Sequence, residues 1–115
     1  MAGRPAHLRT AAIIGLGRIG AGNQGLAGQI PMSHLAAILA TPQLRIVALV
    51  DPDAAMRGQV DTGAPEMDGV TIAESIDAVR GSADVVAICT PAETHAPILK
   101  QALRLSPRVV ICEKP

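Results

Sequence analysis

The most regular feature of this chain is a series of short, continuous apolar runs that end at turn or acidic residues. Runs of Val and Ile that do not alternate with polar residues are typical of strands buried on both faces of a parallel sheet. A weaker run before Glu74 fits the same series. The predicted strands are Ala11 to Ile14, Arg45 to Val50, Val70 to Ile72, Asp84 to Cys89 and Arg108 to Cys112.

Segments with helical spacing lie between these runs: Met32 to Ala40, Ala73 to Arg80, and Ala92 to Leu105. They end before Thr41-Pro42, at Gly81 and before Pro107, as helices commonly do. Alternating strands and helices predict an α/β fold, a Rossmann-type doubly wound parallel sheet with helices on both faces. In the usual strand order the last strand lies at an edge, so we expect either pairing through that edge or a missing C-terminal portion.

A glycine pattern follows directly on the first predicted strand, in Gly15-Leu16-Gly17-Arg18-Ile19-Gly20. In a strand-to-helix turn, Gly15 permits the tight turn, Gly17 lets the backbone approach a pyrophosphate, and Gly20 allows close packing of helix on strand. Backbone amides at such a turn face the anion. The pattern alone is also common in flexible turns, but its position after a strand favours a dinucleotide phosphate site.

Asp51 stands at the end of the second predicted strand, where a carboxylate can accept both hydrogen bonds of an adenosine ribose diol. It repels a 2′-phosphate, so NAD is the expected cofactor, while the nearby Arg57 leaves NADP possible. The simpler alternative is that Asp51-Pro52-Asp53 forms a solvated turn with a helix cap. Some ten residues more than the usual spacing separate Asp51 from the glycines, and we place them at Ala21 to Ile30, with the helix restarting near Pro31.

Two further elements follow later strands. Thr90 and Pro91 fit a helix cap and a first helical position, and they also border the switch point of a doubly wound sheet, where ligands bind. His95 is either a helix-surface residue or a cleft residue. After the last strand, Lys114 could orient a substrate oxygen and Glu113 could bind the nicotinamide riboside, with a surface ion pair as the simpler alternative.

Composition narrows the classes of protein. The chain has 115 residues, no Phe, Tyr or Trp, and zero formal net charge, which argues against nucleic-acid binding. Its apolar runs are too short to cross a membrane, and the polar segment 1–10 reads as a flexible tail rather than a leader. Cys89 and Cys112 each end an apolar run and are interpreted as buried structural thiols. We expect a cytoplasmic protein without a metal site.

Taken together, these motifs resemble the N-terminal domain of the Gfo/Idh/MocA family, named after glucose-fructose oxidoreductase and inositol dehydrogenase. The resemblance spans residues 11–115, the predicted dinucleotide-binding domain. It rests on the glycine motif, Val50-Asp51, Ala87-Ile88-Cys89-Thr90-Pro91 with His95, and Glu113-Lys114-Pro115.

The resemblance implies roles for these residues. Arg18 and Ile19 would contact the pyrophosphate and Asp51 the adenosine ribose. Thr90, Pro91 and Glu113 would lie on the nicotinamide side, with Lys114 near the reacting atoms. Family members carry a second domain that supplies the substrate pocket, and this chain has none of it. The resemblance therefore implies an oxidoreductase acting on a sugar, polyol or related substrate, whose isolated NAD(P)-binding domain hardly turns over.

Two other classes remain open at this point. A non-catalytic module could use the same fold to sense a dinucleotide, and a methyltransferase could hold an adenosyl ligand with a similar glycine turn and acidic residue. The Glu113-Lys114-Pro115 ending argues against the methyltransferase. A homo-oligomer is possible.

Overall fold

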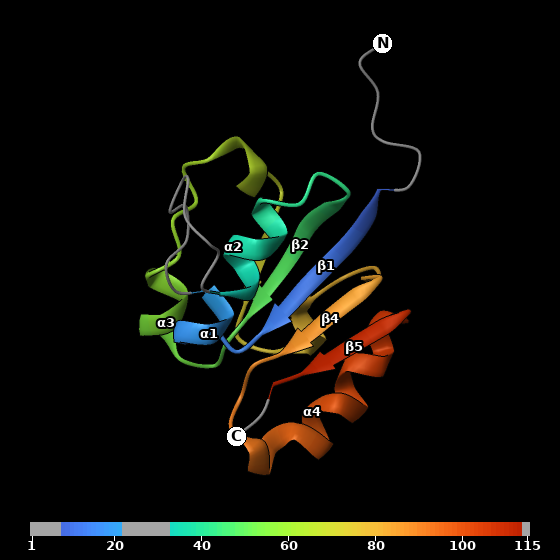
Figure 1. Cartoon of the computed structure of the whole chain (residues 1–115). Coiled ribbons are helices and arrows are strands. Elements are labelled where there is room, and N and C mark those ends of the chain that lie inside the picture. The colour runs from blue at the N-terminus through green and yellow to red at the C-terminus, as the bar shows by residue number, and fades with distance from the viewer. Residues whose placement is uncertain (1–7, 22–32, 114–115) are drawn as a thin grey trace.

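The computed structural model describes residues 8–21 and 33–113, and within them one five-stranded sheet forms the centre of the molecule (Figure 1). Every neighbouring pair of strands is parallel, in the order β3-β2-β1-β4-β5. The predicted Rossmann-type sheet is confirmed. The strands are β1 (Arg9–Ile14), β2 (Leu44–Val50), β3 (Thr71–Ala73), β4 (Val85–Ile88) and β5 (Val109–Cys112).

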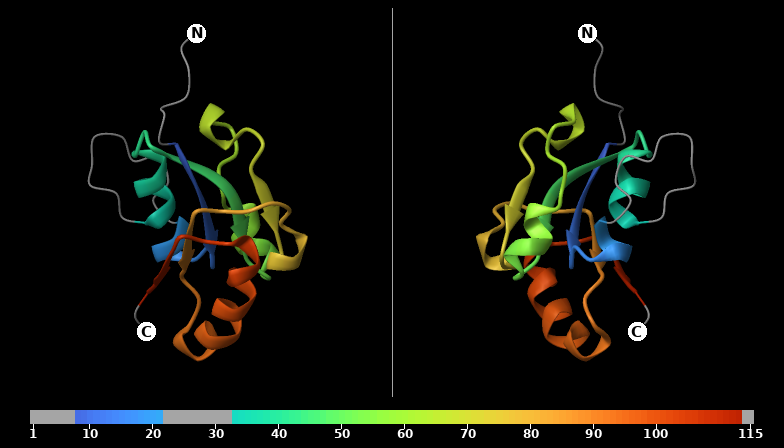
Figure 2. Two further views of the ribbon diagram at one scale, coloured as in Figure 1. Left: turned by 90° about the vertical axis from the view of Figure 1, so that its right-hand side faces the viewer. Right: turned by 90° about the vertical axis from the view of Figure 1, so that its left-hand side faces the viewer.

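Helices cover both faces of the sheet, which explains why its central strands are apolar toward their carboxyl ends. On one face Leu35 and Ile38 of α2 (His34–Leu39) pack against Ile13 of β1. On the other face Leu105, in the last helical turn after α4 (His95–Ala102), packs in a cluster with Ile14. Figure 2 shows α2 and α4 on opposite sides of the sheet. The core is built from aliphatic side chains alone, because the chain has no aromatic residues.

The first strand begins earlier than predicted. Arg9 donates its backbone amide to the Gln43 carbonyl at 2.8 Å, and Thr10 donates its amide to Asp84 Oδ2 at 2.9 Å. These bonds bring Arg9 and Thr10 into β1, so the predicted tail, 1–10, is two residues too long. Residues 1–7 lie outside the described residues.

Helix predictions were partly wrong. Residues 92–105 are helical as expected, in a 3₁₀ turn (Ala92–Thr94), α4, and a second 3₁₀ turn (Leu103–Leu105). Helix α2 is shorter than predicted, beginning at His34 with Ser33 as its N-cap; the predicted restart at Pro31 lies outside the described residues. A short helix, α3 (Ala54–Gly58), was not predicted, although the alternative interpretation of Asp51-Pro52-Asp53 included a helix cap, and Asp53 does cap α3.

The helix predicted over Ala73 to Arg80 is absent, and tertiary pairing explains why. Ala73 ends β3 opposite Val50, and Ser75 is extended with φ −146° and ψ 159°. Only a single 3₁₀ turn, Ile76–Ala78, remains, and it buries Ile76 in the core. Sheet pairing has overridden local helical spacing here.

The last strand lies at a sheet edge, as the strand order predicted. Val109 is 52% exposed and Ile111 39% exposed. Cys112 is exposed as well, so the interpretation of both cysteines as buried thiols was wrong for Cys112. Val109 and Ile111 lie on the uncovered face of this edge strand, and Cys112 ends the strand on the same face as Val110, which packs against the core. The sequence pattern of a buried strand does not reveal which positions an edge strand leaves exposed.

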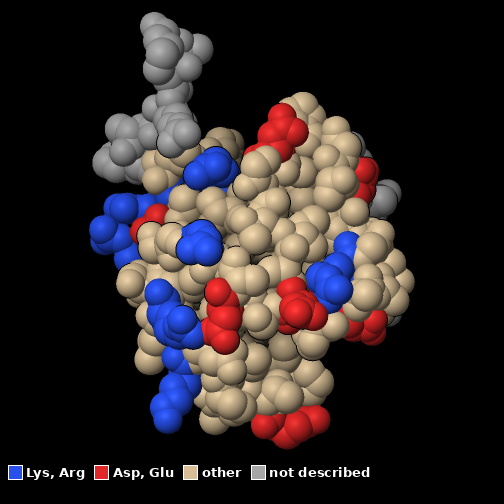
Figure 3. Space-filling model, turned by 180° about the vertical axis from the view of Figure 1, so that it is seen from behind, with Lys and Arg blue, Asp and Glu red and all other residues tan. Residues whose placement is uncertain are grey.

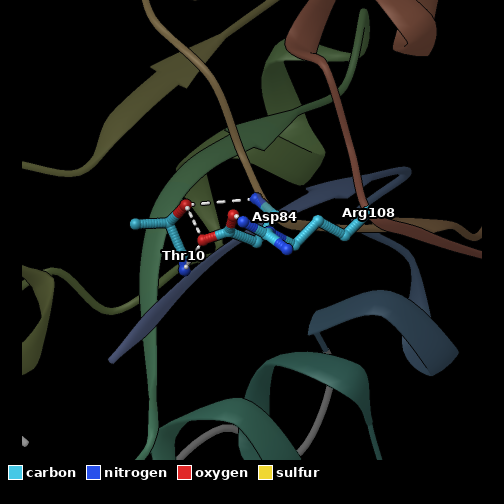
Figure 4. Close-up of polar contacts among 3 residues, drawn as sticks. All are labelled: Thr10, Asp84 and Arg108. Atoms are coloured by element: carbon cyan, nitrogen blue, oxygen red, sulfur yellow. Dashed lines mark hydrogen bonds and ion pairs between the residues drawn. The ribbon is translucent and has the colours of Figure 1, made fainter. Parts of the chain in front are cut away.

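At the opposite end of the strands, an aspartate joins three of them (Figure 4). Asp84 accepts hydrogen bonds from the amide and hydroxyl of Thr10, and its own amide donates to that hydroxyl at 3.1 Å. Arg108 Nε lies 3.4 Å from Asp84 Oδ1. The Thr10 backbone amide, followed by the Thr10 hydroxyl and the charges of Arg9 and Arg108, holds the pKa of Asp84 below its usual range, although partial burial opposes the shift.

Seen from behind, most of the basic side chains in view lie along one side of the molecule, and acidic side chains are scattered over the same face (Figure 3). None of the helices in the described part of the chain combines the length and apolar character needed to cross a membrane.

Candidate functional site

The predicted site residues converge because all five strands point the same way. Backbone bonds tie their carboxyl ends together: Gly15 N donates to the Val50 carbonyl at 2.7 Å, and Cys89 N donates to the Ile14 carbonyl at 2.7 Å. Residues that follow each strand therefore share one edge of the sheet, the usual place for ligands in open α/β sheets.

The three glycines of the turn have different surroundings. Gly15 has φ +97°, and a Cβ on it would lie 2.8 Å from the Cys89 carbonyl carbon. A Cβ on Gly20 would overlap the Gly15 carbonyl oxygen, whereas one on Gly17 would meet nothing within 4 Å. Gly15 and Gly20 are thus required by the fold itself, while Gly17 leaves its backbone bare toward open space.

Only one helical turn follows these glycines within the described residues. Helix α1 (Arg18–Ala21) begins with the Gly17 carbonyl accepting from Gly20 N at 3.1 Å and Ala21 N at 2.9 Å. Residues 22–32, which hold most of the predicted insertion, lie outside the described residues, as do the side chains of Arg18 and Ile19. Within the described part, the site offers backbone amides at the turn.

Asp51 is 9% exposed and held by two backbone donors, which fixes its carboxylate beside the glycine turn. Leu16 N donates to Oδ2 at 2.8 Å, and Asp53 N donates to Oδ1 at 2.8 Å. Arg57, on α3, donates from Nη1 to the Asp51 backbone carbonyl at 2.7 Å. Each carboxylate oxygen can still accept a further hydrogen bond, since an ionised carboxylate has about four acceptor positions.

The Thr90-Pro91 segment is held differently from its predicted role as a cap. The first helical residue is Ala92, Pro91 stands at the cap position, and the Thr90 hydroxyl accepts from the Thr94 hydroxyl at 2.7 Å rather than from a backbone amide. His95 is half-buried, and its Nε2 lies 2.8 Å from the Thr90 carbonyl oxygen. Because a carbonyl can only accept, Nε2 carries the proton and His95 orients this loop.

Glu113 continues the same edge and meets a residue not predicted to be near it. Its amide donates to the Ile88 carbonyl at 3.0 Å, and its carboxylate Oε2 lies 3.4 Å from His34 Nε2. His34 begins α2, so this contact links the segment after the insertion to the end of β5. Lys114, the predicted catalytic residue, lies outside the described residues.

A cavity of about 400 Å³ joins most of the site. Gly15, Gly17, Asp51, Thr90 and Pro91 line it, whereas Gly20, His95 and Glu113 do not. The cavity also has walls that the sequence analysis missed: Met56, Glu74, Ser75, Ile76, Thr94, Ile98 and Gln101 among them.

Cys89 lies at the same cavity and is half-buried. Burial, together with the neighbouring Glu113 and Cys112, raises the pKa of its thiol to about 12. The thiol is therefore protonated at neutral pH, which fits the predicted structural role better than a nucleophile.

A parallel sheet with a glycine turn, a fixed carboxylate after the second strand and a shared cavity defines a dinucleotide-binding domain of the Rossmann type. Comparison with known proteins agrees. The family model described as "Oxidoreductase family, NAD-binding Rossmann fold" matches residues 9–115. The chain belongs to this Gfo/Idh/MocA family of oxidoreductases.

Comparison with one relative shows what fraction of that enzyme's length the match to this chain covers. Inositol 2-dehydrogenase of Rhizobium meliloti (strain 1021) is 33% identical over 91 residues, which cover 77% of this chain and 26% of the relative. The chain thus spans about a quarter of that relative's length. No solved structure matches this chain significantly.

Proposed function

We propose that this domain binds NAD with the pyrophosphate on the bare backbone of Gly17 and the adenosine ribose on Asp51. The observation that carries the proposal is the fixed, nearly buried Asp51 carboxylate, 2.8 Å from the Leu16 amide in the wall of the same cavity as Gly17. Arg18 and Ile19 are assigned to the pyrophosphate by family resemblance. Gly15 and Gly20 shape the turn.

The same carboxylate supports a preference for NAD over NADP. A 2′-phosphate would lie against the negative charge of Asp51, where like charges repel. Arg57 is the cation that could offset this repulsion, but its Nη1 already donates to the Asp51 backbone carbonyl. We therefore assign NAD as the cofactor, with NADP as the weaker ligand.

Replacing Asp51 by Asn tests this assignment. The amide keeps an oxygen acceptor for the Leu16 amide but loses the charge and the acceptor for the Asp53 amide. NADH affinity should therefore fall about 10- to 100-fold, and the NADH over NADPH preference should shrink. Both affinities are measured by fluorescence titration. Asp53→Asn, an exposed neighbour that caps α3, is the matched control and should leave the preference unchanged. An Asp51→Asn protein that still discriminates as strongly would contradict the ribose assignment.

On the nicotinamide side we propose Thr90, Pro91 and Glu113 as contacts and His95 as the residue that orients the Thr90 loop. Lys114, which follows Glu113 directly, would assist the proton of the substrate alcohol. The bound dinucleotide supplies the hydride chemistry. The name of the relative supports a polyol, a sugar or a related small molecule as the substrate of the whole enzyme.

The whole enzyme would need a further domain for its substrate, since hydride transfer requires both reactants to be positioned. We therefore propose that this chain by itself binds the cofactor with little or no turnover. We also propose that the enzyme is cytoplasmic. It assembles with copies of itself through surfaces that include the edge of β5. A pure dinucleotide sensor is the competing function, and activity on joining the chain to a substrate domain would argue against it.

A further inference from the structure

The cavity beyond Asp51 has a part that the phosphates and ribose leave unexplained. Its walls there are apolar: Met56 from α3, Ile76 from the turn after β3, and Ile98 from α4. If Asp51 holds the adenosine ribose, the base attached to that ribose lies in this part of the cavity. A flat, weakly polar ring buried between aliphatic side chains is stabilised by loss of its apolar surface from water.

One face of α4 runs along this part of the cavity. Thr94, Ile98 and Gln101 are spaced four and three residues apart, so they lie on the same side of the helix. The Thr94 hydroxyl is within hydrogen-bonding distance of Thr90 Oγ1 and of the Pro91 carbonyl oxygen at 2.6 Å. Thr94 is therefore occupied in holding the Thr90 loop, which leaves Gln101 as the polar end of this face.

Gln101 differs from Thr94 in its hydrogen bonding. Among residues 8–21 and 33–113, nothing forms a hydrogen bond with its side-chain amide. It is solvent-exposed at the rim of an apolar cavity, where its amide can offer one donor and one acceptor side by side. Glu74 also lines the cavity, but an ionised carboxylate offers acceptors alone.

We propose that Gln101 is a specificity residue that recognises the adenine edge: its side-chain oxygen accepts from the 6-amino group and its side-chain NH₂ donates to ring N1. This pairing matches a donor and an acceptor on each partner; side-chain amides recognise adenine in DNA by an analogous donor and acceptor pair, at N6 and N7. The inference rests on the proposed function, because the ribose on Asp51 is what brings the base to α4.

The test is a double-mutant cycle in which one change is made in the protein and the other in the ligand. The protein and its Gln101→Leu variant are each titrated by calorimetry with NAD and with the dinucleotide that carries unsubstituted purine in place of adenine. The unaltered protein should bind NAD about fivefold more tightly than the purine analogue, and the variant should bind the two equally. Damage to the fold would weaken both ligands together and leave their ratio unchanged.

The control is Lys100→Met. Lys100 directly precedes Gln101 in the same helix but lines a different hollow, so this variant should keep the fivefold ratio. A Gln101→Leu variant with the same ratio as the unaltered protein would overturn the assignment of Gln101 while leaving NAD binding intact. Unaltered protein that binds neither dinucleotide would instead contradict the proposed function, and the assignment with it.

Discussion

Gly17 and Gly20 belong to one motif, yet their surroundings differ completely. A Cβ on Gly20 would overlap the Gly15 carbonyl oxygen, and one on Gly17 would meet nothing within 4 Å. The motif therefore combines a glycine that the fold needs with a glycine whose backbone is left open, where we propose that the pyrophosphate binds. Sequence spacing alone does not separate these two requirements.

Alanine at each position should separate them. Gly20→Ala should lower the free energy of unfolding by about 3 kcal/mol or more, because backbone atoms must shift. Gly17→Ala should change it by no more than about 0.5 kcal/mol, yet weaken NADH binding about tenfold, since the methyl group would project into the site proposed for the pyrophosphate. Urea unfolding and fluorescence titration measure the two quantities. Equal losses of stability in both variants would contradict this division of roles.

The amino ends of three strands, β1, β4 and β5, are linked by contacts of the Asp84 side chain. Asp84 precedes β4, bonds Thr10 in β1 and lies 3.4 Å from Arg108 before β5. Its pKa is held below the usual range in the folded state, so the unfolded chain binds the proton first as the pH falls. This contribution to stability is present above the unfolded-state pKa and is lost as the pH falls through the folded-state pKa.

Asp84→Asn should therefore remove part of the acid sensitivity. Below about pH 4 the unaltered protein should lose stability more steeply than the variant, and near neutral pH the variant should be the less stable of the two. Urea unfolding from pH 6 down to pH 2.5 measures both curves. The exposed Asp68→Asn variant serves as the comparison and should follow the unaltered protein. Parallel curves for Asp84→Asn and the unaltered protein would show that Asp84 does not carry this effect.

The sequence allowed the strands to be predicted better than the helices, for a physical reason. Buried parallel strands are marked by continuous Val and Ile runs, so all five were found to within a few residues of their bounds. Short helices carry little periodic signal. The segment around Ile76 had helical spacing, but pairing of Ala73 with Val50 held its first residue in β3, and only the 3₁₀ turn Ile76–Ala78 formed. Asp53 caps α3, a helix too short to show a pattern.

The site was predictable where it follows strand ends. Asp51, Thr90 and Gly17 line one cavity because parallel strands deliver their carboxyl ends to one edge. The wall made by α4 was within reach, since the helix was predicted and Ile98 and Gln101 share one of its faces. The contact between His34 and Glu113 was not, because it depends on how α2 returns to the sheet after the insertion.

For the molecule as a whole, one geometric relation underlies the function. The sheet sets a glycine turn and a fixed carboxylate side by side in the wall of one cavity, and aliphatic packing on both faces keeps them there. The chain spans about a quarter of the related inositol 2-dehydrogenase. Its own task is accordingly cofactor binding, and that task can be measured without a substrate.

Calorimetric titration of the protein with NADH, with S-adenosylmethionine titrated in parallel, tests whether the domain binds a nicotinamide dinucleotide. We predict one saturable site for NADH, weakened by Asp51→Asn, and no heat with S-adenosylmethionine. Protein shown to be folded that gives no heat with NADH or NAD at millimolar concentrations, or that binds S-adenosylmethionine alone, would contradict the account.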